Sequence, residues 1–136
     1  MVPVVDHIGI AVRSLEAAIP LYRALLGAEP SGTEELASEG VRVAFFGHGP
    51  GRVELLEPID PSSSFARFLA RRGPGVHHVC LRVDDVERAV GRARADGAEL
   101  VSPGIRRGAE GRRVAFLHPR SSGGVLLELA EEPGLD

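Results

Sequence analysis

The sequence predicts an α+β fold in which two tandem βαβββ modules form one curved mixed sheet. The first observation is an internal repeat at a spacing of 71 residues, which aligns VDHIGIAVRSLEAAI from Val5 with VHHVCLRVDDVERAV from Val76. The second is that GVRVAFF from Gly40 and GRRVAFL from Gly111 keep this spacing, while VELLEP aligns with LELAEE at a spacing of 74. Each copy has the pattern of one strand, one helix and three short strands. Agreement over several segments indicates two copies of one structural unit.

The repeat also sets the expected domain organisation. We expect a single domain over residues 1–136, with module one at about 4–72 and module two at about 75–132. A chain of 136 residues has the size of one domain. A unit of about 70 residues is too small to bury both faces of its own sheet. The two modules are therefore expected to pair edge to edge.

The elements follow the same order in both modules. Each module starts with an apolar strand, expected at residues 4–12 and 76–83, and continues with an amphipathic helix. N-capping side chains and C-terminal glycines mark the helix ends; the candidates are Ser14 and Gly27 in module one, and Asp84 or Asp85 with Gly97 in module two. A linking helix is expected at about 65–72, after a run of three serines. Three short strands separated by Gly and Pro complete each module.

The composition excludes several classes of chemistry. All 16 basic residues are arginine, so a lysine Schiff base and a P-loop lysine are ruled out. The single cysteine, Cys80, excludes an internal disulfide and a cysteine zinc site, and we interpret it as a small space-filling side chain. The net charge of −3 and the 4% of aromatic residues argue against a nucleic-acid partner. Any metal ion must therefore be bound by His, Asp or Glu.

The N-terminal segment predicts no targeting or membrane function. Its apolar run is short, contains Asp6 and His7, and has no basic region before it. This pattern is typical of a strand rather than of a signal peptide or a membrane span. We therefore expect no membrane partner and a cytoplasmic location.

Four polar residues are predicted on the inner face of the sheet. Side chains alternate between the faces of a strand, so the apolar Ile8, Ile10 and Val12, and in module two Val79, Leu81 and Val83, are expected against the helices. The opposite face then carries His7, His78, Glu54 and Glu128. An ionised carboxylate buried without a partner costs several kcal/mol, and a metal ion removes that cost. Imidazole and carboxylate without thiolate suit Co²⁺, Ni²⁺, Zn²⁺ or Mn²⁺.

A simpler interpretation stays open for each of these residues. A single histidine in a strand is more often a hydrogen-bonded structural residue than a ligand, and a glutamate near a strand end is usually solvated. A purely structural protein with histidines in its core is therefore an alternative. Among the loops, residues 104–111 are a candidate flexible flap, and Arg106, Arg107 and Arg120 could bind a phosphate group.

These segments together resemble a known family. DHIGIAV, GVRVAFF, VELLEPIDPSSSFARFLARRGPGVHHVCLRVDDVE and GAEGRRVAFLHPRSSGGVLLEL are similar to the methylmalonyl-CoA epimerases of the vicinal oxygen chelate (glyoxalase-like) superfamily. The resemblance extends from about Val5 to Glu131. It implies the glyoxalase/vicinal oxygen chelate fold and a divalent metal ion. It places the metal ligands at His7, Glu54, His78 and Glu128. Arg120 stands where the family often has lysine, and we assign it to binding of the CoA group.

The resemblance implies an isomerase that interconverts the 2R and 2S forms of methylmalonyl-CoA. A base removes the proton next to the thioester, the metal ion stabilises the enolate, and an acid returns the proton on the other face. Glu128 is the candidate for one acid–base group, and Glu54 or a water for the other. The sequence departs from the family at Val43, where some members carry a glutamate that serves as the second group.

Other functions within the superfamily remain alternatives. One is a lactoylglutathione lyase (glyoxalase I), which uses a similar set of His and Glu ligands. Another is a metal-free member that binds a small molecule. For the epimerase we expect a CoA thioester as substrate and, by analogy with the family, a homodimer.

Overall fold

The computed structural model describes residues 4–132, and its contacts divide the chain into two compact units. The first unit comprises residues 7–77. The second comprises residues 78–132 together with 4–6, so the first strand contributes to both. The expected single domain over 1–136 stays a prediction.

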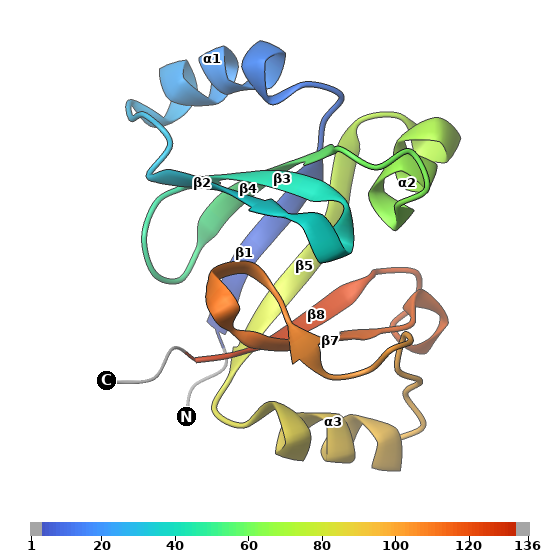
Figure 1. Ribbon diagram of the computed structural model, residues 1–136. Coiled ribbons are helices and arrows are strands. Elements are labelled where there is room, and N and C mark those ends of the chain that lie inside the picture. The colour runs from blue at the N-terminus through green and yellow to red at the C-terminus, as the bar shows by residue number, and fades with distance from the viewer. Residues whose placement is uncertain (1–3, 133–136) are drawn as a thin grey trace. The chain divides into compact units, whose positions relative to one another are not determined.

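The first unit is a four-stranded arrangement with two helices (Figure 1). Its strands follow the order β2-β3-β4-β1, with β4 parallel to β1 and the other neighbours antiparallel. The elements in chain order are β1 (Val4–Ala11), α1 (Leu15–Leu26), β2 (Gly32–Leu36), β3 (Val41–Phe46), β4 (Arg52–Pro58) and α2 (Ser64–Arg72). A 3-10 turn at Ala37–Glu39 joins β2 to β3.

The second unit repeats this plan with one helix. Its strands follow the order β5-β8-β7-β6, with β8 parallel to β5 and antiparallel to β7. The elements in chain order are β5 (Gly75–Val83), α3 (Val86–Ala95), β6 (Arg106–Arg107), β7 (Arg113–Leu117) and β8 (Leu127–Glu131). Short 3-10 turns lie at Ala109–Gly111 and Pro119–Ser121. None of the described helices is long and apolar enough to cross a membrane.

The helix boundaries agree with the predicted caps except at one end. The Ser14 hydroxyl accepts the N–H of Ala17 at the start of α1, and Gly27 ends this helix in the left-handed conformation. Asp85, one of the two candidates, caps α3. Helix α3 ends at Ala95 with Asp96, not Gly97, as its C-cap, because the N–H of Asp96 already bonds carbonyls of the last turn. The linking helix α2 begins at Ser64, one residue earlier than expected.

Strand pairing shows that the repeat is structural. In the first unit Glu54 lies opposite Gly9 on the parallel strand and opposite Phe45 on the antiparallel strand. In the second unit Glu128 lies opposite the equivalent residues of the repeat, Cys80 and Phe116. The register around each glutamate is thus the same in both units. The two glutamates occupy equivalent places in two copies of one motif.

Each unit has an apolar core under its helix, as the alternation of side chains predicts. Figure 1 shows α1 over the strands of the first unit and α3 against those of the second. The core under α1 includes Ile10, Val12, Val53 and Leu55, and the core under α3 includes Leu81, Val83, Leu127 and Leu129. Two expected members differ. Ile8 is 38% exposed and Val79 is half-buried, and neither belongs to the cluster that packs on its helix.

Two glycines of the repeat give a matched stability prediction. Gly40 and Gly111 both have a left-handed backbone, with φ of 66° and 69°. Replacing either by alanine is expected to cost about 1–2 kcal/mol for this conformation. A Cβ at Gly40 would also lie 2.8 Å from the Cβ of Asp60, whereas nothing lies within 4 Å of one at Gly111. Urea denaturation should therefore show the larger loss for Gly40→Ala; equal losses would contradict this packing.

Candidate metal and acid–base site

The first unit brings together two of the predicted ligands. His7 comes from β1 and Glu54 from the neighbouring strand β4, and His7 Nδ1 lies 3.2 Å from Glu54 Oε2. The two side chains are only 6% and 4% exposed. Gly9, which lies opposite Glu54, has no side chain to separate them. The predicted placement of His7 and Glu54 on a buried face of the strands is therefore confirmed, and the structure shows in addition that the two side chains are in contact.

The second unit contains the equivalent pair. His78 comes from β5 and Glu128 from β8, and His78 Nε2 lies 3.1 Å from Glu128 Oε1. These side chains are 4% and 10% exposed. The edge of the His78 ring meets the Phe116 ring, with centroids 5.5 Å apart. Cys80 is buried beside Val114 and Ala130, in agreement with its interpretation as a space-filling residue.

Each pair suits two neighbouring ligands of a divalent ion. Metal–nitrogen and metal–oxygen bonds of about 2.1 Å place adjacent ligand atoms roughly 3.0–3.4 Å apart. The two nitrogen–oxygen distances, 3.2 and 3.1 Å, fall in this range. The donor set of imidazole and carboxylate matches borderline divalent metals. The residues of each unit therefore fit the group that the sequence implies.

An arginine that the sequence did not single out adjoins the first pair. Arg52 Nε and Nη2 both lie 3.2 Å from Glu54 Oε2, and the Arg52 side chain is only 8% exposed. Its guanidinium also stacks over the Phe45 ring, 5.1 Å from the centroid. Sequence reasoning missed it because its significance depends on the register of β4. Its position two residues before Glu54, on the same face of the strand, was the available signal.

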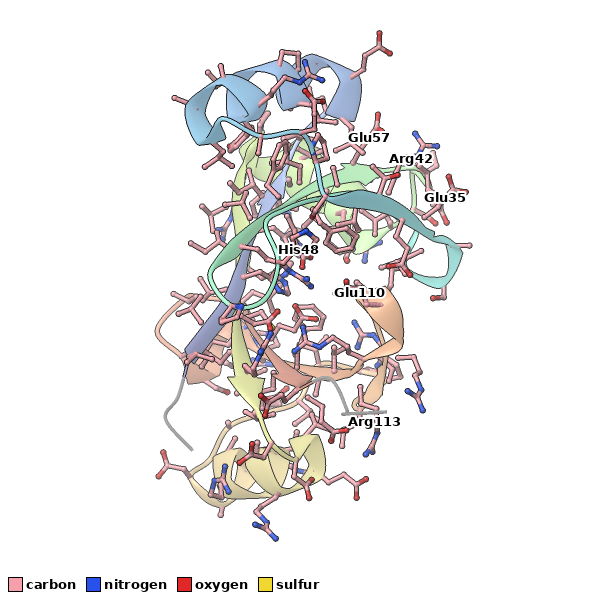
Figure 2. All side chains as sticks on the ribbon, turned by 90° about the vertical axis from the view of Figure 1, so that its left-hand side faces the viewer. Glu35, Arg42, His48, Glu57, Glu110 and Arg113 are labelled. Carbon is pink, nitrogen blue, oxygen red and sulfur yellow. The ribbon has the colours of Figure 1, made fainter. Side chains whose placement is uncertain are left out.

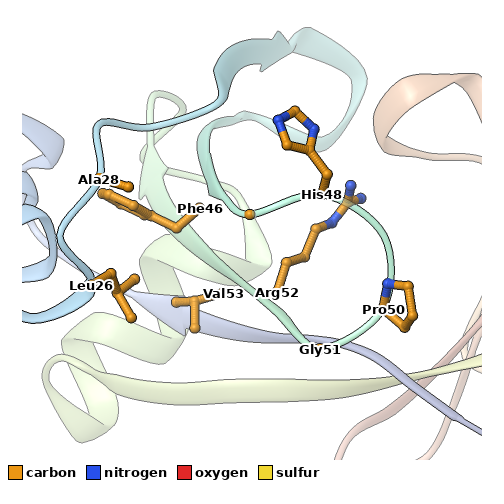
Figure 3. A pocket seen from close by; sticks show the side chains of 9 residues that line it. Leu26, Ala28, Phe46, His48, Pro50, Gly51, Arg52 and Val53 are labelled. Atoms are coloured by element: carbon orange, nitrogen blue, oxygen red, sulfur yellow. The ribbon is translucent and has the colours of Figure 1, made fainter.

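Arg52 also lines an open pocket of the first unit (Figure 3). The pocket measures about 300 Å³ and lies between the end of α1 and the turn that connects β3 to β4. Leu26, Phe46 and Val53 form apolar walls, while His48 and Arg52 add polar groups. Arg52 therefore contacts both this pocket and the Glu54 carboxylate.

A second missed group is a buried ion cluster in the second unit. Asp6 is fully buried, and its two carboxylate oxygens accept bonds from Arg82 at 2.9 Å and Arg112 at 2.9 Å. Arg112 Nε also donates to the carbonyl of Glu131. An acidic residue within an apolar strand was the signal, because such a residue needs a buried partner. The cluster links β1 to β5, to β8 and to the residue just before β7 within this unit.

Other predicted residues lie outside these pairs. Arg120 is on the surface, with its side chain 67% exposed and its guanidinium 3.1 Å from Glu99. Part of the candidate flap is regular structure, since β6 pairs with β7.

Val43 is buried on β3, opposite Glu34 and Leu56. A buried valine cannot exchange a proton at this place.

The ion pairs of Arg42 are exposed to solvent, whereas that of Arg52 is buried. Arg42 lies between Glu35 and Glu57 on the surface of the first unit (Figure 2). The hydrogen bond to Glu35 raises the pKa of Arg42 above its ordinary value. Exposed pairs of this kind contribute little to stability. Substitution of Arg42 therefore serves as a control for substitution of the buried Arg52.

Comparisons with known proteins identify the family. Residues 6–116 match the model of the glyoxalase/bleomycin resistance protein/dioxygenase superfamily. The human mitochondrial methylmalonyl-CoA epimerase is 39% identical over 127 residues, which cover 93% of this chain and 72% of that protein. The chain belongs to the methylmalonyl-CoA epimerase family of this superfamily. The ethylmalonyl-CoA/methylmalonyl-CoA epimerase of Cereibacter sphaeroides is 38% identical over 96% of this chain and 99% of its own length.

Solved structures of the epimerase family agree. A variant of the Streptomyces coelicolor methylmalonyl-CoA epimerase in complex with 2-nitronate-propionyl-CoA has a TM-score of 0.90 and 37% identity, over 96% of this chain and 97% of its own. A methylmalonyl-CoA epimerase in complex with methylmalonyl-CoA and NH4+ has a TM-score of 0.92 and 35% identity, over 100% and 99%. The predicted family, α+β fold class and isomerase class are thus confirmed.

Proposed function

We propose that this chain interconverts the 2R and 2S forms of methylmalonyl-CoA and requires one divalent metal ion. The observation that supports the substrate most directly is the 37–39% identity to methylmalonyl-CoA epimerases over 93% of the chain. The metal requirement is supported by the two buried His–Glu pairs, whose atoms are spaced as adjacent ligands. In this proposal His7, Glu54, His78 and Glu128 all bind the same ion.

The chain's own residues would hold the ion and move the proton. When bound, a divalent cation supplies a positive charge that stabilises the enolate formed from the thioester. The imidazoles of His7 and His78 would contribute neutral ligands, and the two glutamates would offset the charge of the ion. Co²⁺, Ni²⁺, Zn²⁺ and Mn²⁺ all suit these four ligands.

Glu128 is the proposed base. Its carboxylate would accept the proton from C2 of the substrate, and the electron pair of the broken C–H bond would move into the thioester as the enolate. Return of a proton from a second acid to the opposite face of C2 gives the other epimer. Proton exchange with solvent then returns both groups to their starting protonation states. Glu54 or a water is the candidate for this second step, since Val43 carries no acid.

Arg120 is the proposed contact for the CoA group. It is exposed, and its present partner Glu99 is also on the surface, so a phosphate could replace this partner at low cost. A homodimer and a cytoplasmic location accompany the proposal as predictions from the sequence.

Solvent deuterium uptake tests the proposal. Metal-loaded protein in D₂O should exchange the C2 hydrogen of methylmalonyl-CoA, as followed by loss of its ¹H NMR signal. Removal of the metal with a chelator should abolish the exchange, and addition of Co²⁺ should restore it. Methylglyoxal with glutathione serves as the alternative substrate. Turnover of that mixture alone would instead indicate a lactoylglutathione lyase, and metal-independent exchange would refute the metal requirement.

A further inference from the structure

We infer that Arg52 is a positioning residue that fixes the Glu54 carboxylate for metal binding. This inference rests on the proposed function, because it assumes that Glu54 is a metal ligand. Arg52 is a cation with no free lone pair, so it cannot itself bind a metal ion. Its effect must therefore pass through the carboxylate that it contacts.

The contact between Arg52 and Glu54 restricts the orientation of the Glu54 carboxylate. Arg52 and Glu54 lie two residues apart on β4, so their side chains are on the same face of the strand. Both Nε and Nη2 approach the same oxygen, Oε2, at 3.2 Å. His7 Nδ1 approaches this oxygen at the same distance. Two buried side chains therefore restrict the rotation of one carboxylate.

The Arg52 side chain is itself held in place by packing against Phe45. Its side chain is 8% exposed, and its guanidinium lies over the Phe45 ring. Phe45 is opposite Glu54 on β3, so the ring, the guanidinium and the carboxylate share one face of the two strands. A rigid, planar guanidinium loses little freedom when it forms such a contact. Residues that support metal-binding carboxylates in this way commonly change metal affinity or activity about 10–100-fold when mutated.

The repeat shows that this arginine is particular to the first unit. His7 lies opposite Arg52 on the parallel strands β1 and β4. The equivalent place in the second unit, next to Leu127 on β8, is occupied by Leu126. The sequence of the second unit thus suggests leucine as the substitute, since leucine stands at the aligned position, directly before β8.

Metal affinity of Arg52→Leu tests the inference. Competition with a chelating dye should show that Co²⁺ binds about 10–100-fold more weakly than to the wild type. Arg52→Lys, which keeps the charge but loses the planar fork, should recover part of this loss. The visible spectrum of bound Co²⁺ should shift in Arg52→Leu, because a carboxylate that moves alters the ligand field. A role in stability alone would leave the spectrum and the affinity of the folded protein unchanged.

Arg42→Ala is the matched control, because it removes an exposed arginine that pairs with two glutamates in the same unit. It should leave Co²⁺ affinity within a factor of about 3, since it touches neither pair. If Arg52→Leu does not fold, the Co²⁺ affinity and the visible spectrum of Arg52→Lys test the inference instead. If both are the same in Arg52→Lys as in the wild type, the inference is overturned.

Wild-type exchange of the C2 hydrogen, measured on the same preparations, separates the two claims. If the wild type does not exchange it but Arg52→Leu binds Co²⁺ weakly, the proposed reaction fails and the role of Arg52 stands. If the wild type exchanges it and Arg52→Leu binds Co²⁺ normally, only the role of Arg52 fails. A wild type that binds no metal overturns both.

Discussion

Glu128→Gln is expected to lower the rate of deuterium uptake at C2 of methylmalonyl-CoA by about 10²–10⁴-fold, the usual contribution of an acid–base group. Glutamine has nearly the same shape as glutamate but cannot accept the substrate proton. Because Glu128 is buried and 3.1 Å from His78 Nε2, the amide can still bond to the imidazole. The fold should therefore remain intact while proton transfer is lost.

The control is Glu87→Gln, which changes an exposed glutamate of α3 in the same unit. Its rate should stay close to that of the wild type, since surface substitutions away from the site have small effects. Circular dichroism and metal analysis of both variants separate loss of chemistry from loss of structure or metal. A folded, metal-loaded Glu128→Gln protein that exchanges deuterium within about threefold of the wild type would exclude Glu128 as the base.

Asp6→Ala is expected to lower the free energy of unfolding by about 3–5 kcal/mol, the typical cost of removing one partner from a buried ion pair. Asp6 is fully buried and bonds to both Arg82 and Arg112. Without this carboxylate, two arginines would keep their charges in a largely buried environment. Arg112 Nη2 already has no hydrogen-bond partner within the described residues, so the cluster has little capacity to compensate.

Urea denaturation of Asp6→Ala and of Asp84→Ala provides the comparison. Asp84 is exposed just before the cap of α3, and its replacement should change stability by less than about 0.5 kcal/mol. A loss below about 1 kcal/mol in Asp6→Ala would show that the cluster contributes little beyond a surface pair.

The local elements and the buried positions of the two histidines and two glutamates could be predicted because the sequence repeats itself. Alternation of side chains identifies the buried faces, and the repeat by itself aligns Glu54 with Glu128. Caps locate the helix starts because Ser14 and Asp85 bond to nearby backbone groups. The caps and the alternation of side chains are signals within a short stretch of sequence, and the alignment of the glutamates is repeated in both copies.

The supporting arginines could not be predicted in the same way. Arg82 and Arg112 reach Asp6 across 76 and 106 positions of the chain, and such pairing depends on strand register. Arg52 falls outside the repeat, because its equivalent is Leu126. The Gly97 signal places the end of α3 one residue too late, since it does not show that Asp96 already closes the last turn.

Anomalous X-ray diffraction from a Co²⁺-loaded crystal would show whether His7, Glu54, His78 and Glu128 bind one ion. Data collected on both sides of the cobalt absorption edge locate the ion independently of the protein atoms. We predict one strong anomalous peak per chain, bonded to His7, Glu54, His78 and Glu128 at about 2.1 Å. A peak bound by only one His–Glu pair, or by other residues, would contradict the claim that both copies of the repeat contribute to a single metal site.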